Sequence, residues 1–189
     1  MTEKQQSSVA AKAQEQAVIS RLQQVPLLAR LPANFIQFIR KAAAPTPITA
    51  GQVLCREGDD PSGLYILFKG VLSLRKDEEE VARVEPVSCA GVVSALTGDP
   101  QPEDVVAEEE GIVMHVAQQI LNAALTKNLE LFQRLSRNAI NSLADQLTSA
   151  NEAQSAIALE RAQLLQKASE VEIDLNDARM IASMRGDLE

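Results

Sequence analysis

Short apolar runs alternate with turn residues through the middle of the chain, from about residue 44 to residue 117. Valine, leucine, isoleucine and aromatic residues fill the runs, whereas glycine, proline and acidic residues separate them, which is typical of β-strands joined by turns. The expected strands are Gln52–Arg56, Leu64–Phe68, Val71–Arg75, Val81–Val84, Val105–Ala107 and Ile112–Val116. Six or more short strands at this spacing predict an antiparallel β-barrel or jelly roll.

Helical patterns precede this region. Residues rich in alanine, glutamine and glutamate run from about Ser8 to Gln24, and Val25-Pro26 interrupts them. An apolar elbow follows over residues 27–32, and a second helix is expected to carry Phe35, Ile36, Phe38 and Ile39. These patterns predict an N-terminal helical segment over residues 1–43, with the first seven residues frayed.

The last part of the chain contains neither glycine nor proline between Ile112 and Arg185, and its apolar residues recur with a 3,4 spacing. The two heptad positions hold thirteen residues, of which only Gln154 and Arg161 are polar. One position contains Ile140, Leu147, Gln154, Arg161, Ala168, Leu175 and Ala182, and the other contains Leu143, Ala150, Ile157, Leu164, Val171 and Ala178. A heptad kept over six repeats predicts a long coiled-coil helix.

A helix over residues 119–185 would be roughly 100 Å long at about 1.5 Å per residue. That length exceeds one face of a small barrel, so the distal half is expected to pair with another helix. A parallel homodimer is the simplest solution, and a helix that lies on its own domain is the alternative. The predicted fold is therefore α+β, with a helical segment (1–43), a β-barrel (44–118) and a dimerising C-terminal helix (119–189).

The 189 residues carry a formal net charge of −8, from 18 Lys+Arg against 26 Asp+Glu. This balance argues against general nucleic-acid binding, which needs basic side chains to replace the counterions of phosphate. His115 is the single histidine, and Cys55 and Cys89 are the two cysteines. We therefore expect no metal site, no cofactor, no disulfide framework and no enzymatic activity.

No apolar run approaches the roughly 18 residues of a membrane span. The N-terminus also lacks the pattern of a signal peptide. These observations predict a cytoplasmic protein without membrane insertion.

Glycines at the expected turns form a recognisable series. The motifs are Ala50-Gly51-Gln52-Val53-Leu54, Arg56-Glu57-Gly58-Asp59 and Leu64–Leu72 with Gly70, and the apolar elbow Val25–Leu31 precedes them. In this order they resemble the cyclic-nucleotide-binding domain family, which includes the sensor half of the catabolite activator proteins. The resemblance covers about residues 25–145, and it implies a barrel that is followed by helices.

The family's ligand cassette corresponds to residues 90–105 here. In the family, a short helix presents backbone amides to the cyclic phosphate, an arginine pairs with the phosphate charge, and a glutamate binds the ribose hydroxyl. Val92 stands where the resemblance implies the glutamate, and Gln101 stands where it implies the arginine. The candidate pocket residues are Gly91, Val92, Val93, Ser94, Gln101, Pro102 and Glu103.

These replacements weaken the expected phosphate site. Glutamine supplies one neutral donor group, whereas arginine supplies a charged, bidentate clamp. Asp99, Glu103 and Asp104 surround the same loop, and one carboxylate at 4 Å from a phosphate repels it by about 4 kcal/mol at an effective dielectric constant of about 20. Between Val71 and Glu110 there are eleven acidic and three basic residues. The sequence therefore predicts that usual cyclic-nucleotide binding has been lost.

Other residues could supply the missing charge or contact. Arg56, Lys69, Arg75 or Arg83 could turn into the pocket from the expected strands, although solvated positions are the simpler interpretation. Asn138, Asn141 or Ser142 could reach a ligand from the C-terminal helix, as the dimer helix does in the family. The acidic runs 76–80 and 108–110 are expected to be solvated turns, with an acidic patch that docks a basic partner as the alternative.

Three functions remain open at this stage. The first is a non-enzymatic regulatory or scaffolding homodimer that has a degenerate cyclic-nucleotide-binding-like barrel and acts on a protein partner. The second is a sensor of another small molecule or nucleotide that signals through the coiled coil. The third is a truncated transcription factor; within residues 119–189 no space remains for a recognition helix, so we expect no DNA binding.

Overall fold

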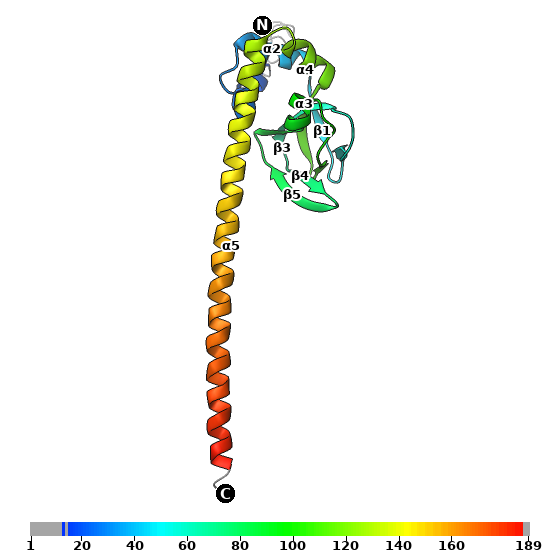
Figure 1. The fold of residues 1–189 in the computed structure, drawn as a ribbon. Coiled ribbons are helices and arrows are strands. Elements are labelled where there is room, and N and C mark those ends of the chain that lie inside the picture. Colours follow the sequence, from blue (N-terminus) through cyan, green and yellow to red (C-terminus); the bar gives the residue numbers. More distant parts are fainter. Residues whose placement is uncertain (1–12, 14, 187–189) are drawn as a thin grey trace. The chain divides into compact units, whose positions relative to one another are not determined.

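The computed structural model describes residue 13 and residues 15–186. These residues form two compact units, which are divided between Ser142 and Leu143. Residues 15–22 are helical, and the elements that follow are η1 (Pro26–Leu28), α2 (Ala33–Ala42), β1 (Pro45–Ile48), β2 (Val53–Cys55), β3 (Gly63–Lys69), β4 (Leu72–Lys76), β5 (Glu79–Val84), β6 (Ser88–Ala90), α3 (Val92–Thr97), β7 (Asp104–Ala107), β8 (Gly111–Ala117), α4 (Gln118–Leu125) and α5 (Leu129–Gly186) (Figure 1).

The eight strands form two antiparallel four-stranded sheets in the first unit. One sheet has the order β1-β8-β3-β6, and the other has the order β2-β7-β4-β5. The sheets make a jelly-roll-like sandwich, which confirms the predicted α+β fold with N-terminal helices and a long C-terminal helix. Each of the six expected strands is present, and β1 and β6 are additional.

Strand β3 is the centre of the first unit because both of its faces are buried. Leu64, Ile66 and Phe68 belong to the core that the helices share. Tyr65 and Leu67 belong to the core between the two sheets. Side chains alternate between the two faces of a strand. β3 therefore separates the core between the helices and the sheet, called the helix-side core below, from the core between the two sheets.

The N-terminal helices cover one face of this strand. Phe35, Ile36 and Ile39 are spaced as one face of α2, and they are buried in the helix-side core together with Leu22 and Leu28. The two helices flanking the apolar elbow are therefore as predicted from residue 15 onward. The frayed residues expected at positions 1–7 lie outside the described residues.

The C-terminal segment begins with two helices instead of one. Helix α4 ends at Leu125, and residues 126–128 separate it from α5. The side-chain Oδ1 of Asn128 accepts a hydrogen bond from the backbone N–H of Leu131 (3.0 Å), which is the contact of an N-cap. Asn128 thus starts a new helix at a place where neither glycine nor proline marks a break.

A second side-chain contact fixes the start of α5 within the first unit. The Nδ2 group of Asn138 donates hydrogen bonds to the backbone carbonyls of Leu27 (2.9 Å) and Ala29 (2.8 Å). Leu131, Leu135 and Ala139 from the same turns of α5 are buried in the helix-side core. Asn138 therefore binds the apolar elbow and is engaged in holding the fold, not in reaching a ligand.

Gly63 allows a close approach between the backbones of β3 and the end of β8. Its φ is +123°, and a Cβ atom added there would lie 2.1 Å from the carbonyl oxygen of Val116 and 2.7 Å from the backbone nitrogen of Gln118. We expect Gly63→Ala to lower the free energy of unfolding by more than about 3 kcal/mol, because a disfavoured φ and a backbone clash add together. Urea denaturation followed by circular dichroism measures the change.

Gly58→Ala is the matched control for this prediction. Gly58 also has a positive φ (+80°), but nothing lies within 4 Å of the added Cβ. Its substitution should cost only about 1 kcal/mol, which is the conformational part alone. Equal losses in the two variants would contradict the role of close approach at Gly63.

Candidate functional site

The cassette predicted from the sequence forms a turn, a short helix and a loop at one end of the sandwich. Gly91 precedes α3 and Gly98 follows it, and both adopt left-handed backbone conformations (φ 75° and 81°). The backbone N–H of Ala95 donates to the carbonyl of Gly91 (3.0 Å), which closes the first turn of α3. The short helix that the resemblance implies is therefore present.

Gln101 occupies the interior of this cassette and is 2 % exposed. Its backbone N–H donates to the carbonyl of Asp59 (2.8 Å), and its carbonyl accepts from the N–H of Gly58 (2.9 Å). Its side-chain Nε2 donates to the hydroxyl of Ser62 at 3.4 Å. The residue at the expected arginine position is thus a buried, neutral side chain that is held by protein partners.

A chain of hydrogen bonds continues from Gln101 into the sandwich. The Tyr65 hydroxyl lies 2.8 Å from the carbonyl of Leu54 and 3.1 Å from the Ser62 hydroxyl. Because a carbonyl only accepts, Tyr65 donates to Leu54 and the Ser62 hydroxyl donates to Tyr65. The order of donation is therefore Gln101 to Ser62, Ser62 to Tyr65, and Tyr65 to the backbone, so each of these side chains has a partner.

The Gln101 carboxamide also fills the space beside the cassette glycine. A Cβ atom added at Gly91 would lie 2.7 Å from the carbonyl oxygen of Gly63, 3.6 Å from the Tyr65 ring and 3.9 Å from Gln101 Nε2. His115, one strand away, stacks on Tyr65 with ring centroids 4.5 Å apart, and its Nε2 lies 2.9 Å from the carbonyl of Ser62. His115 is exposed on the strand face opposite Met114, as the alternation of β8 predicts.

The other candidate pocket residues are not among the hydrogen-bond partners of Gln101. Val92 packs against the helix-side core, and Val93 is exposed. The hydroxyl of Ser94 donates to the Gly91 carbonyl (3.3 Å) within its own helix. Pro102 is exposed and Glu103 is half-buried. The structure thus brings together Gly91 and Gln101 with Ser62 and Tyr65, two residues that sequence reasoning did not include.

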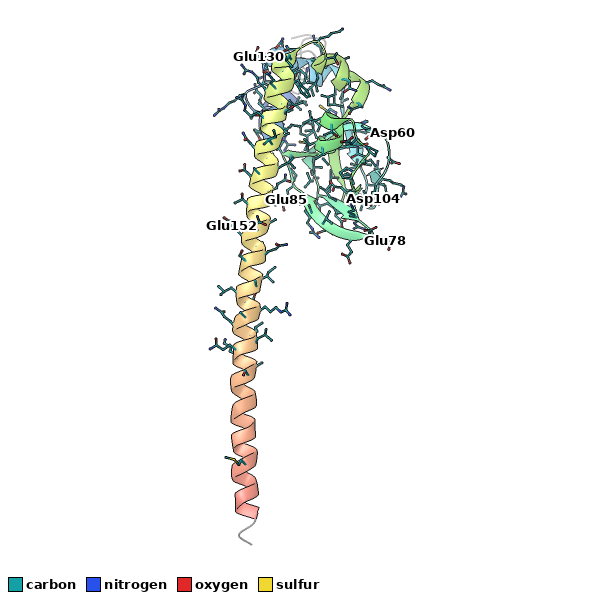
Figure 2. The ribbon with its side chains drawn as sticks, in the orientation of Figure 1. Asp60, Glu78, Glu85, Asp104, Glu130 and Glu152 are labelled. Atoms are coloured by element: carbon teal, nitrogen blue, oxygen red, sulfur yellow. The ribbon has the colours of Figure 1, made fainter. Side chains whose placement is uncertain are left out.

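Negative charge surrounds this loop. Asp59 Oδ2 accepts from the backbone N–H of Arg56 (2.9 Å), and Asp104 Oδ1 accepts from that of Glu57 (2.6 Å). The pKa of the buried Cys55 thiol is raised to about 11, mainly by burial and further by nearby carboxylates that include Asp59 and Asp104. Figure 2 shows Asp60 and Asp104 on the same side of the first unit, whereas Glu78 lies near the β4–β5 hairpin. An anion at this end of the sandwich would therefore meet several carboxylates.

Two of the four basic residues considered for the missing charge are paired with carboxylates elsewhere, and the other two are exposed. Arg75 Nε donates to the Ser73 hydroxyl (2.9 Å), and its guanidinium also binds Glu108. Arg83 pairs with Glu80 (2.6 Å). Arg56 and Lys69 are exposed. Within the described residues, the hydrogen bond of the Gln101 side chain goes to Ser62 and to none of these four side chains.

The predicted dimer positions lie exposed along α5. Ile140, Leu143, Leu147, Ile157 and Leu164 are large apolar side chains with substantial exposure, and Ala150, Gln154 and Arg161 are exposed at the same heptad positions. Val171 and Leu175 belong to the part of α5 whose side chains lie outside the description. We call the eight described residues, Ile140 through Leu164, the α5 stripe.

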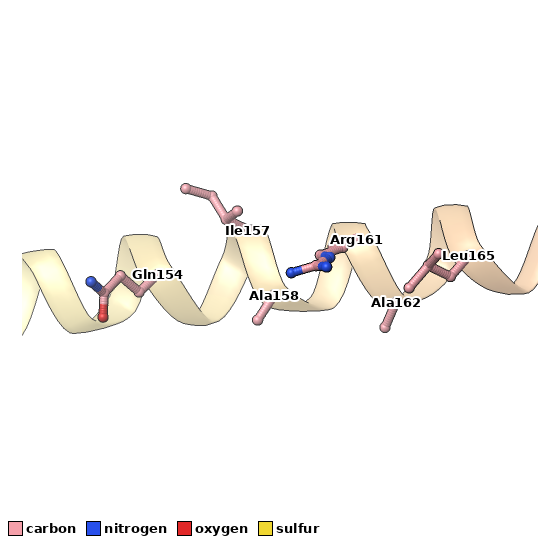
Figure 3. Close-up of a pocket in the computed structure, with 6 residues that line it drawn as sticks. All are labelled: Gln154, Ile157, Ala158, Arg161, Ala162 and Leu165. Atoms are coloured by element: carbon pink, nitrogen blue, oxygen red, sulfur yellow. The ribbon is translucent and has the colours of Figure 1, made fainter.

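An open groove of about 350 Å³ lies on α5 within the second unit (Figure 3). Gln154, Ile157 and Arg161 of the α5 stripe line it together with Ala158, Ala162 and Leu165. Figure 3 shows Ala158 and Ala162 on the same side of the helix. The sequence analysis did not include Ala158, Ala162 and Leu165, because it considered only two of the seven heptad positions. Their spacing of three or four residues is also that of one helix face.

The comparisons with known proteins agree with this fold. Residues 45–128 match the family model of the cyclic nucleotide-binding domain. This match confirms the resemblance that the glycine motifs indicated. No sequence among the curated proteins matches the chain.

Solved structures show the same architecture. The regulatory domain of Toxoplasma gondii PKA, determined with cAMP, is 28% identical with a TM-score of 0.54, and the alignment covers 59% of this chain and 44% of that chain. This chain therefore spans less than half the length of the Toxoplasma chain. The N-terminal domain of a transcriptional regulator from Streptomyces coelicolor A3(2) is 22% identical with a TM-score of 0.55, covering 68% of this chain and 94% of that one.

A protein of Geobacter metallireducens GS-15, described in its structure as cyclic nucleotide-binding, is 21% identical with a TM-score of 0.63. The alignment covers 68% of this chain and 96% of that chain. At this identity the likeness to the bacterial structures concerns the fold. Of the helices that the structure describes, none is both long and apolar enough to cross a membrane.

Burial at the cassette gives a testable pH dependence. The pKa of Glu103 is raised, first by burial and also by Glu57, while Lys76 opposes the shift. Between the pKa of Glu103 in the unfolded chain and its higher pKa in the folded chain, the folded chain holds a proton that the unfolded chain has released. The free energy of unfolding therefore falls as the pH rises through this range. Glu103→Gln should therefore be more stable than the parent at neutral pH and equally stable below the ordinary pKa of glutamate.

Urea denaturation at a series of pH values measures this difference. Glu109→Gln removes the same charge at an exposed position and is the control for net charge. A stability gain that is the same in both variants, or one that persists in acid, would contradict the role of burial at Glu103.

Proposed function

We propose that this protein is a non-enzymatic regulatory homodimer of the cytoplasm. In this proposal its cyclic-nucleotide-binding-like barrel no longer binds a cyclic nucleotide in the usual way, and α5 acts through contact with other protein chains. The observation that carries the proposal is the α5 stripe, because it is a long apolar surface with no partner among the described residues.

The length and exposure of α5 support self-association. The helix has 58 residues and is about 87 Å long at 1.5 Å per residue. Ile157 is 66 % exposed and Leu164 is 59 % exposed, although large apolar side chains of this kind are normally buried. Pairing with α5 of a second copy would bury them in repeating layers.

The buried Gln101 supports the loss of the usual ligand. A phosphate at this position would meet a carboxamide in place of a guanidinium, and the carboxamide already donates to Ser62. One carboxylate at 4 Å repels a phosphate by about 4 kcal/mol, which is half of the roughly 8 kcal/mol of a micromolar complex. Both effects act against binding of a cyclic nucleotide.

The relatives support a regulatory role. The Toxoplasma structure is a regulatory domain with cAMP bound, and the Streptomyces structure is a domain of a transcriptional regulator. The free thiols of Cys55 and Cys89 agree with a reducing compartment.

The α5 stripe gives the first test of this proposal. We expect the full chain to be a dimer by sedimentation equilibrium, and Ile157→Asp/Leu164→Asp to be a monomer, because two buried carboxylates per helix oppose pairing. The dissociation constant of the dimer should be at least about a hundredfold higher for this double variant than for the parent chain.

Leu159→Asp/Gln166→Asp is the matched control. These positions lie on α5 two residues after Ile157 and Leu164 and off the α5 stripe, and Leu159 is 63 % exposed. The control adds the same charge and should remain a dimer. A monomeric parent chain, or equal weakening of both double variants, would overturn the dimer through this stripe.

Calorimetry with cyclic AMP and cyclic GMP tests the ligand site. We expect no saturable heat for the parent chain up to about 1 mM ligand. Gln101→Arg should bind with a dissociation constant below about 0.1 mM, because it restores a charged donor opposite the phosphate. Gln133→Arg, at an exposed position, controls for the added positive charge.

A micromolar dissociation constant for the parent chain would overturn the lost-site part of the proposal. It would instead favour a working sensor that signals through the coiled coil. Equal gains in Gln101→Arg and Gln133→Arg would show that the added charge acts from a distance and not at the cassette.

A further inference from the structure

A groove of about 430 Å³ lies in the first unit, away from both the cassette and the α5 stripe. It is bounded by the first turns of α2, the end of α4 and the first turn of α5. The residues that line it include Phe35, Phe38, Ala123, Ala124, Lys127 and Leu131. All of these residues lie within one compact unit.

The groove exists because small side chains face large ones. Phe35 and Leu131 are buried and belong to the helix-side core. On α4, Ala123 and Ala124 provide only methyl groups, so the space above this core stays open. Phe38 lies against Phe35 with ring centroids 6.0 Å apart and is 38 % exposed. The result is an apolar cleft with an aromatic side chain at its rim, of a size that admits one or two apolar side chains.

The charge around this groove is opposite to that of the whole chain. Residues 15–43 contain four basic residues and one acidic residue, Glu15, which pairs with Arg40 at 2.9 Å, and residues 118–142 contain three basic residues and one acidic residue. Lys127 lines the groove, and Lys41 follows Phe38 by one turn of α2. Glu130 is paired with Arg134 at 2.7 Å, and Arg134 Nη1 also donates to the carbonyl of Arg30 (3.3 Å). Lys127, Lys41 and Arg30 are exposed.

We propose that this groove binds an acidic, amphipathic segment of a partner protein. An apolar side chain of the partner enters between Phe38 and Leu131, and its carboxylates face Lys127, Lys41 and Arg30. Such a groove between helices is the arrangement that receives the apolar face of a helix. Complementary charge at the rim selects an acidic partner over a basic one. The site is separate from the dimer proposed through the α5 stripe.

The probe for this site is a synthetic amphipathic helix with leucines on one face and glutamates on the other. Its twin carries lysine in place of each glutamate. Fluorescence anisotropy with the full chain should show that the acidic peptide binds at least about tenfold more tightly than the basic twin, and that added salt weakens it. Equal binding of the two peptides would overturn the proposal.

Two variants locate the binding. Phe38→Asp and Lys127→Glu should each weaken the acidic peptide by about tenfold, because one removes the apolar contact and the other reverses the rim charge. Val81→Asp is the matched control for Phe38→Asp, since Val81 is a 56 % exposed apolar residue on β5. Lys127→Glu alters an exposed side chain, so it tests the site even where Phe38→Asp disturbs folding.

The same samples distinguish this site from the dimer. Sedimentation of Phe38→Asp should give the mass of the parent chain. A change of mass would show that the groove is a contact between copies, which would overturn the proposal of a separate partner. Peptide binding that Phe38→Asp and Lys127→Glu leave unchanged would also overturn it, whatever the oligomeric state of the chain.

Discussion

The first unit depends on the burial of both faces of β3. A strand with apolar residues at successive positions is stable only between two covering layers, because each face would otherwise expose its side chains to water. The second sheet covers the face that carries Tyr65 and Leu67, and the helices cover the face that carries Ile66. The positions of α2, α4 and the start of α5 follow from this requirement. The cassette lies where the two cores meet, next to Tyr65.

This position explains why a neutral residue occupies the centre of the cassette. A charged side chain can be buried there only when a counter-charge comes with it, as a phosphate would for arginine. Gln101 needs no counter-charge, since its carboxamide and backbone find their partners in Ser62, Asp59 and Gly58. The same site can therefore be closed by the protein itself. An anionic ligand would therefore meet two separate physical obstacles. Gln101 fills the site, and the surrounding carboxylates repel negative charge.

Much of the fold could be predicted from the sequence because its strands are short apolar runs between turn residues. β1 was missed since Pro45 and Pro47 argue against a strand, yet β1 is an edge strand, where a missing N–H is tolerated. β6 has only three residues, which is too short for a pattern. The break before α5 has a signal in Asn128, but a single capping residue inside a helical composition does not stand out. The burial of Gln101 depends on Ser62 and Tyr65, which are distant in the sequence, so no local pattern could show it.

The separation of charge within the first unit gives it a large electric dipole moment. The helical residues carry the positive end, and the acidic turns around the β4–β5 hairpin, which lies far from α2 in Figure 1, carry the negative end. At an ionic strength near 0.1 M, screening acts over about 10 Å, so a partner experiences only the nearer end of this dipole. The net charge of −8 of the whole chain therefore differs from the local charge that a nearby partner meets. Anions and cations that approach the first unit would be turned toward opposite ends of it before any contact is made.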